Sequence, residues 1–271
     1  MICFPNAKIN LGLNIVSKRT DGYHNIETIF YPINLRDVLE IVPSKEKEGV
    51  FKQTGIEIEG DPNSNLVLKA YRLLKEQFNI PEIDIYLRKN IPFGAGLGGG
   101  SADAAFMLKL LNDYAELNLS TEQLEAFAAK IGADCPFFIQ NKPMFAEGIG
   151  NIFTPVELSL KGYYMTLIKP DIHVSTQEAY SNVHPQQPSI PIIDIIKKPM
   201  DEWNNLLFND FEESVFSKHP AIRDIKEKLY KSGALYASMS GSGSSVFGIF
   251  DTPQNLNDTF SEHLSYNIQL Q

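Results

Sequence analysis

The most informative stretch of the sequence is a run of glycines. Five of the seven residues from Gly94 to Gly100 are glycine. Such a run costs conformational entropy on folding and suits neither a helix nor a strand. It lies between a predicted strand and a predicted helix, where backbone N–H groups and a helix N-terminus can hold an anion. We therefore predict a phosphate-binding loop. A plain tight connection between the two elements is the alternative.

The residues around these glycines separate several kinds of phosphate loop. Gly94 to Gly99 satisfy the GxGxxG pattern of dinucleotide-binding enzymes, but that pattern alone is weak evidence. A dinucleotide fold needs strand-loop-helix units in a parallel array, whereas the preceding strands are spaced for antiparallel pairing. No Lys-Ser or Lys-Thr pair closes the loop, and the sequence lacks the VAIK, HRD and DFG motifs of protein kinases. An oxidoreductase that binds NAD stays open as an alternative.

The elements that must position this loop follow from the periodicity of apolar residues. The predicted strands cover residues 9–16, 26–33, 38–42, 83–87, 163–168 and 245–250. The predicted helices cover residues 65–74, 102–111, 120–131, 203–215 and 221–231. We expect the first three strands to form one antiparallel sheet, with a turn at residues 19–23 and an exposed proline-rich loop at 185–191.

Two helix starts carry capping signals. Ser120 and Gln123 have the spacing of a capping box. Ser64 or Asn65 is placed to cap the helix over residues 65–74.

Composition limits the classes of function. The chain has 271 residues, 24 Lys plus Arg and 33 Asp plus Glu, which gives a formal net charge of −9. Nucleic acid is therefore a poor candidate partner, although a local site for a small phosphate ligand remains open. The chain has two cysteines, Cys3 and Cys135, and they form no CxxC motif. This argues against a disulfide scaffold and favours a location in the reducing cytoplasm. We find no apolar run long enough for a membrane span and no secretory signal.

Several segments together resemble one family. Residues 92–102, PFGAGLGGGSA, resemble the nucleotide-phosphate loop of the GHMP kinases, a superfamily of small-molecule kinases. Most members have a Ser-Ser pair after Gly-Leu-Gly, whereas this chain has Gly99 and Gly100. With these glycines, the loop resembles that of the branch that phosphorylates 4-diphosphocytidyl-2-C-methyl-D-erythritol in non-mevalonate isoprenoid synthesis. PNAKINL at 5–11, RTDGYH at 19–24, GADCPFF at 132–138 and MSGSGSSVF at 239–247 agree with it.

The resemblance implies phosphoryl transfer from ATP, with Mg²⁺, to an alcohol. It implies that Asp134 is the general base and Lys8 its cationic neighbour, since the attacking hydroxyl must lose a proton. From the residues alone, Asp134 would instead suit a helix start ahead of Pro136. The implied phosphate-binding residues are Pro92, Gly94, Ala95, Gly96, Leu97, Gly98, Gly99, Gly100, Ser101 and Ala102. Because glycine replaces the Ser-Ser pair, which helps to bind magnesium in other branches, the protein ligands of the metal stay unassigned.

The resemblance also implies the residues that contact the two organic ligands. The implied substrate-binding residues are Asn10, Tyr23, His24, Phe30, Thr176 and Tyr180. Tyr23 and His24 would contact the cytosine base, although from the residues alone His24 suits a solvated loop. Phe30 and Tyr180 are candidates for the other wall of the cytosine pocket, with core packing as the alternative. Asn65 matches the adenine side, and a helix cap is its other role. Gly241 and Gly243 are expected to let a C-terminal loop approach the active site, or simply to form a turn. Cys135 is expected to be a packing residue.

The implied fold is a two-domain α+β GHMP kinase fold. Residues 1–153 would form a ribosomal-protein-S5-like, nucleotide-binding domain, and residues 154–271 a ferredoxin-like domain. The expected partner is a small molecule rather than a nucleic acid or a membrane, and the oligomeric state is not readable. A mevalonate-type kinase of the same superfamily is the nearest alternative, and a non-catalytic nucleotide-binding relative is a third.

Overall fold

The computed structural model describes the chain except for residues 47, 58–60 and 62–63. The described residues divide into two compact units, and each unit is discontinuous in sequence. Unit 1 holds residues 1–7, 35–93 and 98–142, and unit 2 holds residues 8–34, 94–97 and 143–271. The domain boundary at residue 153 stays a prediction.

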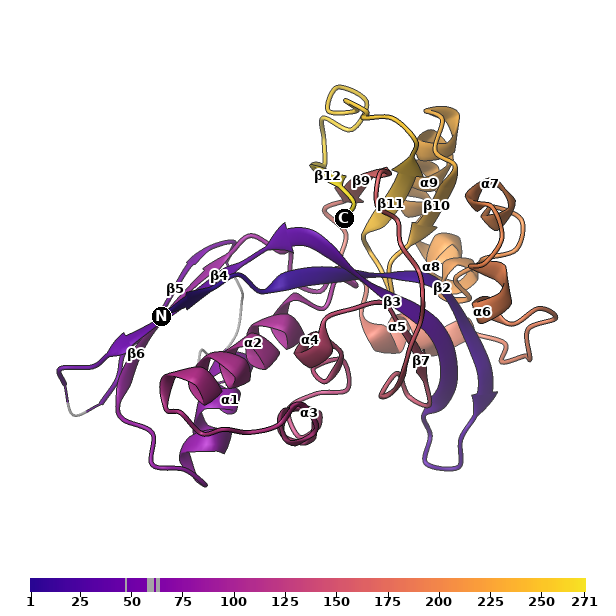
Figure 1. Cartoon of the computed structure of the whole chain (residues 1–271). Helices are drawn as coiled ribbons and strands as arrows, with labels where there is room; N and C mark the ends of the chain where they lie inside the picture. Colours follow the sequence, from indigo (N-terminus) through magenta and orange to yellow (C-terminus); the bar gives the residue numbers. More distant parts are fainter. Residues whose placement is uncertain (47, 58–60, 62–63) are drawn as a thin grey trace. The chain divides into compact units, whose positions relative to one another are not determined.

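Unit 1 contains a four-stranded sheet with helices on one side of it (Figure 1). The strand order is β1 (Ile2–Cys3), β4 (Val38–Pro43), β6 (Ile83–Lys89) and β5 (Phe51–Gly55). β4 pairs antiparallel with β1 and β6, and β5 pairs parallel with β6. The helices are α1 (Leu66–Lys75), α2 (Gly99–Tyr114), α3 (Thr121–Ala129) and α4 (Phe137–Gln140). The glycine loop connects β6 to α2.

The caps predicted for two helices of unit 1 are present. Asn65 caps α1, and its side chain accepts a hydrogen bond from the backbone N–H of Val67 at 2.9 Å. Ser120 and Gln123 form the complete capping box of α3. These bonds satisfy N–H groups that a helix leaves free at its start, which explains why both helices begin where they do.

One sheet of unit 2 is antiparallel throughout, in the order β10 (Tyr236–Met239), β11 (Val246–Phe250), β9 (Tyr164–Lys169) and β12 (Leu264–Gln269). Helix α9 (Pro220–Lys231) packs on β10 and β11, beside α8 (Phe211–Lys218). Its buried Ile222, Ile225 and Leu229 recur at helical spacing and face the core of this unit.

The second sheet contains the strand on which Lys8 lies. Its strand order is β2 (Asn6–Lys18), β3 (His24–Arg36), β7 (Met144–Glu147) and β8 (Ile152–Pro155). β7 pairs antiparallel with β3 and β8. The remaining helices are short: α5 (Thr176–Ala179), η2 (Tyr180–Asn182), α6 (Ile192–Ile195) and α7 (Met200–Trp203). None of the helices in the described residues has both the length and the apolar character of a membrane span.

Two predictions about the elements are wrong. The first three predicted strands do not share one sheet, because β2 and β3 pair with each other while β4 pairs with β1 and β6. The predicted helix over 203–215 is interrupted between α7 and α8. In that gap the backbone N–H of Leu13 donates to the carbonyl of Phe208, and the N–H of Ile15 donates to the Asp210 carboxylate. Pairing with β2 thus replaces helical hydrogen bonds there.

Candidate active site

The glycine loop alternates left-handed and ordinary backbone conformations. Gly94, Gly96 and Gly98 have φ angles of +61°, +75° and +69°. At Gly96 a Cβ atom would lie 1.9 Å from the backbone oxygen of Ser240, so only glycine fits. Gly98 is the N-cap of α2 and provides no side chain to cap it. The first N–H groups of this 16-residue helix are therefore without a side-chain cap, which suits a phosphate ligand.

Lys8 lies beside residues 94–97, the part of this loop that belongs to unit 2. Its ammonium donates to Oδ1 of Asn10 at 2.6 Å and to the carbonyl of Gly96 at 3.2 Å, and its backbone N–H donates to Leu97 at 2.9 Å. The Lys8 side chain is only 4% exposed and lies 4.5 Å from the ring centroid of Phe30. The predicted placement of Lys8 and Asn10 on one strand face is confirmed, and the contacts fix the ammonium beside the loop.

The second glycine turn also meets the loop. Ser240 Oγ donates to the carbonyl of Gly96 at 2.9 Å and accepts from the backbone N–H of Asn10 at 3.3 Å. Gly241 has a φ of +55°, and a Cβ there would lie 3.4 Å from Gly96 Cα. Gly243, with a φ of +89°, follows in the same turn. The C-terminal loop therefore approaches the glycine loop closely at Gly241, and the role of this turn in the active site stays a prediction.

Asn209 holds this turn in place. Its amide donates to the carbonyls of Met239 and Gly241, both at 2.8 Å, while its Oδ1 accepts from the N–H of Phe211. Sequence reasoning missed Asn209, Ser240 and Thr28. Ser240 lies inside the motif at 239–247, which was a usable signal, whereas Asn209 had none. Thr28 accepts from the Asn10 amide at 3.0 Å across the sheet.

Asp134 lies in unit 1, in the turn that precedes α4. It is partly buried, and it stands two residues before Pro136, which occupies the N-cap position of α4. Asp134 is therefore not the N-cap residue of α4. The neighbouring Cys135 is fully buried, and burial raises the pKa of its thiol to about 12. That environment suits packing and not nucleophilic attack.

Two of the predicted cytosine contacts are adjacent in unit 2. The rings of His24 and Tyr180 stack with centroids 4.8 Å apart and an interplanar angle of 17°. Burial and the nearby Lys18 ammonium lower the pKa of His24, so its ring is neutral at pH 7 and can both donate and accept. Tyr23 is 61% exposed beside His24, an exposure that leaves its ring available to a ligand.

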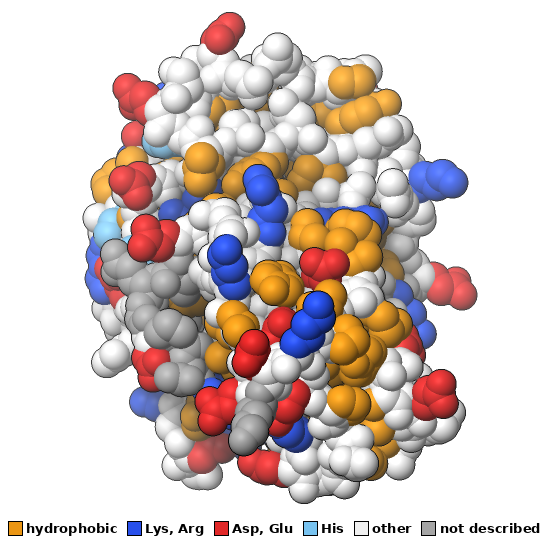
Figure 2. All heavy atoms as spheres, turned by 90° about the vertical axis from the view of Figure 1, so that its left-hand side faces the viewer, with side chains coloured by type: hydrophobic (Ala, Val, Ile, Leu, Met, Phe, Trp, Pro, Cys, Tyr) orange, Lys and Arg blue, Asp and Glu red, His pale blue; other side chains and the backbone are white. Residues whose placement is uncertain are grey.

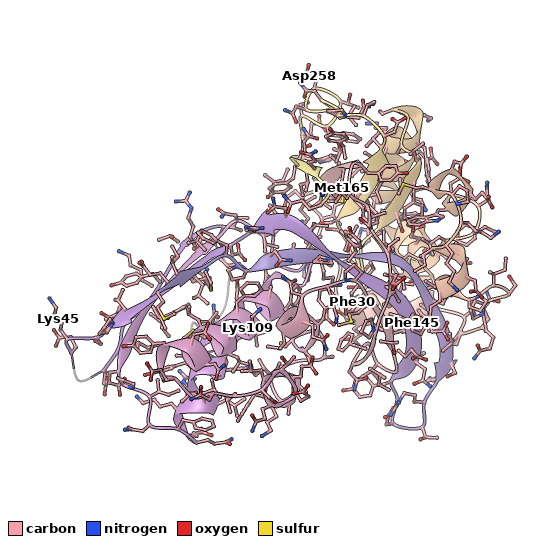
Figure 3. The ribbon with its side chains drawn as sticks, viewed as in Figure 1. Phe30, Lys45, Lys109, Phe145, Met165 and Asp258 are labelled. Carbon is pink, nitrogen blue, oxygen red and sulfur yellow. The ribbon has the colours of Figure 1, made fainter. Side chains whose placement is uncertain are left out.

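The other predicted organic-ligand contacts differ in exposure. Phe30 is 2% exposed and packs under Lys8 and against Phe153. It lies on β3, next to the strand that carries Phe145 (Figure 3). Thr176 is exposed at the start of α5, after the capping residue Ser175. Asn65 uses Oδ1 for its cap and donates through Nδ2 to Gln53. Its predicted cap role is confirmed.

The charges on the surface are mixed where they can be seen. Figure 2 shows one face of the molecule, on which Lys and Arg side chains are interspersed with Asp and Glu. That pattern differs from the clustered basic surface typical of nucleic-acid binding. Within the described residues, no group of three or more His, Cys, Asp or Glu side chains is placed to hold a metal ion.

Comparisons with known proteins agree on one family. The model of the GHMP kinases N terminal domain matches residues 65–142, and the model of the GHMP kinases C terminal region matches residues 192–264. The 4-diphosphocytidyl-2-C-methyl-D-erythritol kinase of Bacteroides fragilis is 61% identical over 259 residues, which are 94% of each chain. The kinase of the same name from Chlorobium phaeobacteroides is 43% identical and covers 95% of this chain and 92% of its own.

Solved structures show the same fold. A crystal structure of a 4-(cytidine 5'-diphospho)-2C-methyl-D-erythritol kinase aligns with a TM-score of 0.85 at 28% identity, over 100% of this chain and 99% of the other. The mevalonate kinase of Methanococcus jannaschii aligns at 0.69 with 14% identity, over 100% and 98% of the two chains, which shows the fold alone. These matches confirm the predicted α+β fold class.

Proposed function

This chain belongs to the GHMP kinases, and from that membership we propose that it transfers the γ-phosphate of ATP to the 2-hydroxyl of 4-diphosphocytidyl-2-C-methyl-D-erythritol. The reaction is a step of non-mevalonate isoprenoid precursor synthesis, and we assign it to the cytoplasm. The observation that carries the proposal is the near-full-length similarity to curated kinases named for this substrate.

The phosphates of ATP are assigned to the glycine loop and the start of α2. Support comes from the positive φ angles of Gly94, Gly96 and Gly98 and from the absence of a side-chain cap on α2. Pro92 and residues 94–102 would surround the phosphates through their backbone. Mg²⁺ would enter with ATP, because this ion prefers phosphate oxygens and retains several water molecules.

The chemical step assigns separate tasks to Asp134 and Lys8. The substrate hydroxyl attacks the γ-phosphorus, the bond from that phosphorus to the ADP oxygen breaks, and the hydroxyl proton passes to the Asp134 carboxylate. Lys8 offsets negative charge on the transferred group. The contacts of Lys8 with Asn10 and Gly96 support this role, since they hold a buried ammonium in one position before ATP binds.

The cytidine end of the substrate is assigned to His24, Tyr23 and Tyr180. A stacked pair of rings with an exposed aromatic neighbour offers both a face for a nucleobase and hydrogen-bonding nitrogens. Asn10, Phe30 and Thr176 stay proposed substrate contacts. The Phe30 ring also lies under the Lys8 ammonium.

The adenine side is assigned to Asn65, and its capping role calls for a variant that separates the two functions. Asn65→Ser keeps a good helix cap but loses the amide. If Asn65 contacts adenine, this variant raises the KM for ATP while the thermal unfolding midpoint stays unchanged. An unchanged KM for ATP would leave Asn65 only as a cap.

The reaction itself is tested with purified protein, Mg²⁺ and ATP. The cytidylyl alcohol, mevalonate and homoserine are supplied in turn, ADP release is followed in a coupled assay, and the product is identified by phosphorus NMR. We expect turnover with the cytidylyl alcohol and a phosphate on its 2-oxygen. Turnover of mevalonate or homoserine without turnover of the cytidylyl alcohol would overturn the assignment.

The general base is tested by Asp134→Asn. This variant should bind ATP normally and lower kcat at least about 100-fold, the low end for loss of a general base. Asp113→Asn is the matched control, because Asp113 is exposed near the end of α2. A near-normal kcat for Asp134→Asn would remove this residue from the base role.

A further inference from the structure

A buried ionic cluster in unit 1 has no part in the chemistry assigned so far. Lys89, at the end of β6, is 2% exposed, and its ammonium donates to Asp37 and, at 2.6 Å, to Asp103. Asp37 is fully buried and also accepts from the backbone N–H groups of Asn90 and Ile91. Asp103 is 2% exposed on α2. The three side chains therefore form one closed, dehydrated group.

The cluster joins the two ends of the glycine loop. Lys89 precedes the loop, and Asp103 follows it on the helix whose first turn we assign to phosphate. The first residue of that helix, Gly99, packs against Ile91, two residues beyond the end of β6. A Cβ at Gly99 would lie 2.8 Å from a methyl carbon of Ile91 and 3.4 Å from the Lys89 ammonium. The ammonium is thus a direct neighbour of the helix start.

Stability alone gives little reason for this arrangement. Burying charges costs free energy, and apolar residues of similar volume often serve a core equally well. Within the described residues, Oδ1 of Asp103 has no hydrogen-bond partner, which adds to the cost. A polar cluster in such a position can instead fix one geometry among several that a purely apolar contact would allow.

The ionisation state of the cluster fits its surroundings. Burial raises the pKa of Asp103 to about 8, with the Lys89 ammonium opposing the rise and the Asp37 carboxylate adding to it. The Cys3 thiol on β1 interacts electrostatically with Asp103, and Lys109 on α2, labelled in Figure 3, interacts with Cys3. Burial raises the pKa of Cys3 to about 12 and lowers that of Lys109. Near neutral pH the raised pKa favours the protonated, neutral form of the Asp103 carboxyl.

Building on the proposed function, we propose that Lys89 and Asp103 are positioning residues for ATP. Their buried contact ties residue 89 to the second turn of α2, and so fixes the direction of the first-turn N–H groups toward the phosphates. The alcohol substrate gains nothing from this contact. Loss of the contact therefore weakens ATP binding selectively, whereas a merely structural role would lower stability without separating the two substrates.

The test compares the wild type with four variants by steady-state kinetics, calorimetric titration with ATP and thermal unfolding. Lys89→Met should raise both the KM and the Kd for ATP at least about 10-fold, because small misplacements of binding groups are costly. The KM for the alcohol should stay unchanged. Asp103→Asn keeps an acceptor for Lys89 and should retain most of the ATP affinity. Lys75→Met is the control, since Lys75 pairs with Glu82 at the far end of α1 in the same unit.

Lys89→Met leaves two buried carboxyls without their cation, so it can fail to fold. The double variant Lys89→Met/Asp103→Leu leaves Asp37 as the one remaining carboxyl of the cluster. Asp37 still accepts from the backbone N–H groups of Asn90 and Ile91, so this variant should keep the fold. We expect it to show the same selective loss of ATP affinity. A folded double variant with the wild-type Kd for ATP would overturn this inference. If the wild-type protein itself bound no ATP, the proposed function would fail instead.

Discussion

The sharpest structural prediction concerns Gly96, the residue where the loop, the Lys8 strand and the C-terminal glycine turn meet. We expect Gly96→Ala to lower the free energy of unfolding by about 3 kcal/mol or more. An alanine at φ +75° costs about 1–2 kcal/mol, since left-handed backbone crowds its Cβ. Its Cβ would lie 1.9 Å from the Ser240 carbonyl oxygen, and overpacking of this kind costs about 1–3 kcal/mol.

Two further effects of this substitution act in opposite directions. A shift of the backbone at residue 96 would weaken the hydrogen bonds from Ser240 and Lys8 to its carbonyl, each of which contributes about 1 kcal/mol. Alanine also lowers the conformational entropy of the unfolded chain, which offsets the loss of stability by about 0.4–1 kcal/mol. The net effect stays strongly destabilising because the steric contact is with backbone and not with a flexible side chain.

Gly100→Ala is the matched control within the same run of glycines. Gly100 lies in the first turn of α2, and a Cβ there would make only an ordinary contact, 3.7 Å from a methyl of Leu66. Alanine in a helix should leave stability unchanged or raise it by up to about 1 kcal/mol. Urea unfolding followed by circular dichroism measures both variants. If they differ in stability by less than about 0.5 kcal/mol, the steric reasoning at Gly96 is wrong.

Three other predictions follow from contacts described above. The pKa of Asp103 is higher in the folded chain than in the unfolded chain. Between about pH 5 and pH 7 the carboxyl is therefore protonated only in the folded state. The contribution of Asp103 to the free energy of unfolding falls by about 1.4 kcal/mol per pH unit as the pH rises. Urea unfolding across this range should show that slope in the wild type and its loss in Asp103→Asn, and equal slopes would contradict the raised pKa. Ser120→Ala should lower the free energy of unfolding by about 1 kcal/mol, because it removes the capping box of α3. The shift of the unfolding midpoint measures this loss. Tyr180→Leu should raise the KM for the cytidylyl substrate up to about tenfold, because one aromatic stacking contact contributes that much to affinity, and should leave the KM for ATP unchanged. A change in the KM for ATP alone would contradict the assignment of Tyr180 to the cytidylyl substrate.

Sequence reasoning succeeded where the signal is local. The capping box at Ser120 and Gln123, the cap at Asn65 and the turn before His24 each depend on residues a few positions apart. The placement of Lys8 and Asn10 on one face needs only the period of a strand. The candidate phosphate-binding residues depend on the resemblance of residues 92–102 to a family motif, and they stay predictions.

The failures have a common physical cause in long-range pairing. The helix predicted through Asn209 is broken because Asp210 accepts a hydrogen bond from β2, 195 positions earlier in the chain. β4 was assigned to the wrong sheet because periodicity shows a strand but not its partner. Lys89 and Asp37 are 52 positions apart, and no local pattern indicates that they meet in a dehydrated core.

The interleaving of the two units has a consequence for chimeric proteins. The chain passes from one unit to the other at residues 7–8, 34–35, 93–94, 97–98 and 142–143. A recombinant made by a single crossover anywhere in the gene would therefore combine segments of different parental origin inside at least one hydrophobic core. Relatives of this kinase should exchange substrate preference more readily through point substitutions at the ligand contacts than through the shuffling of whole modules.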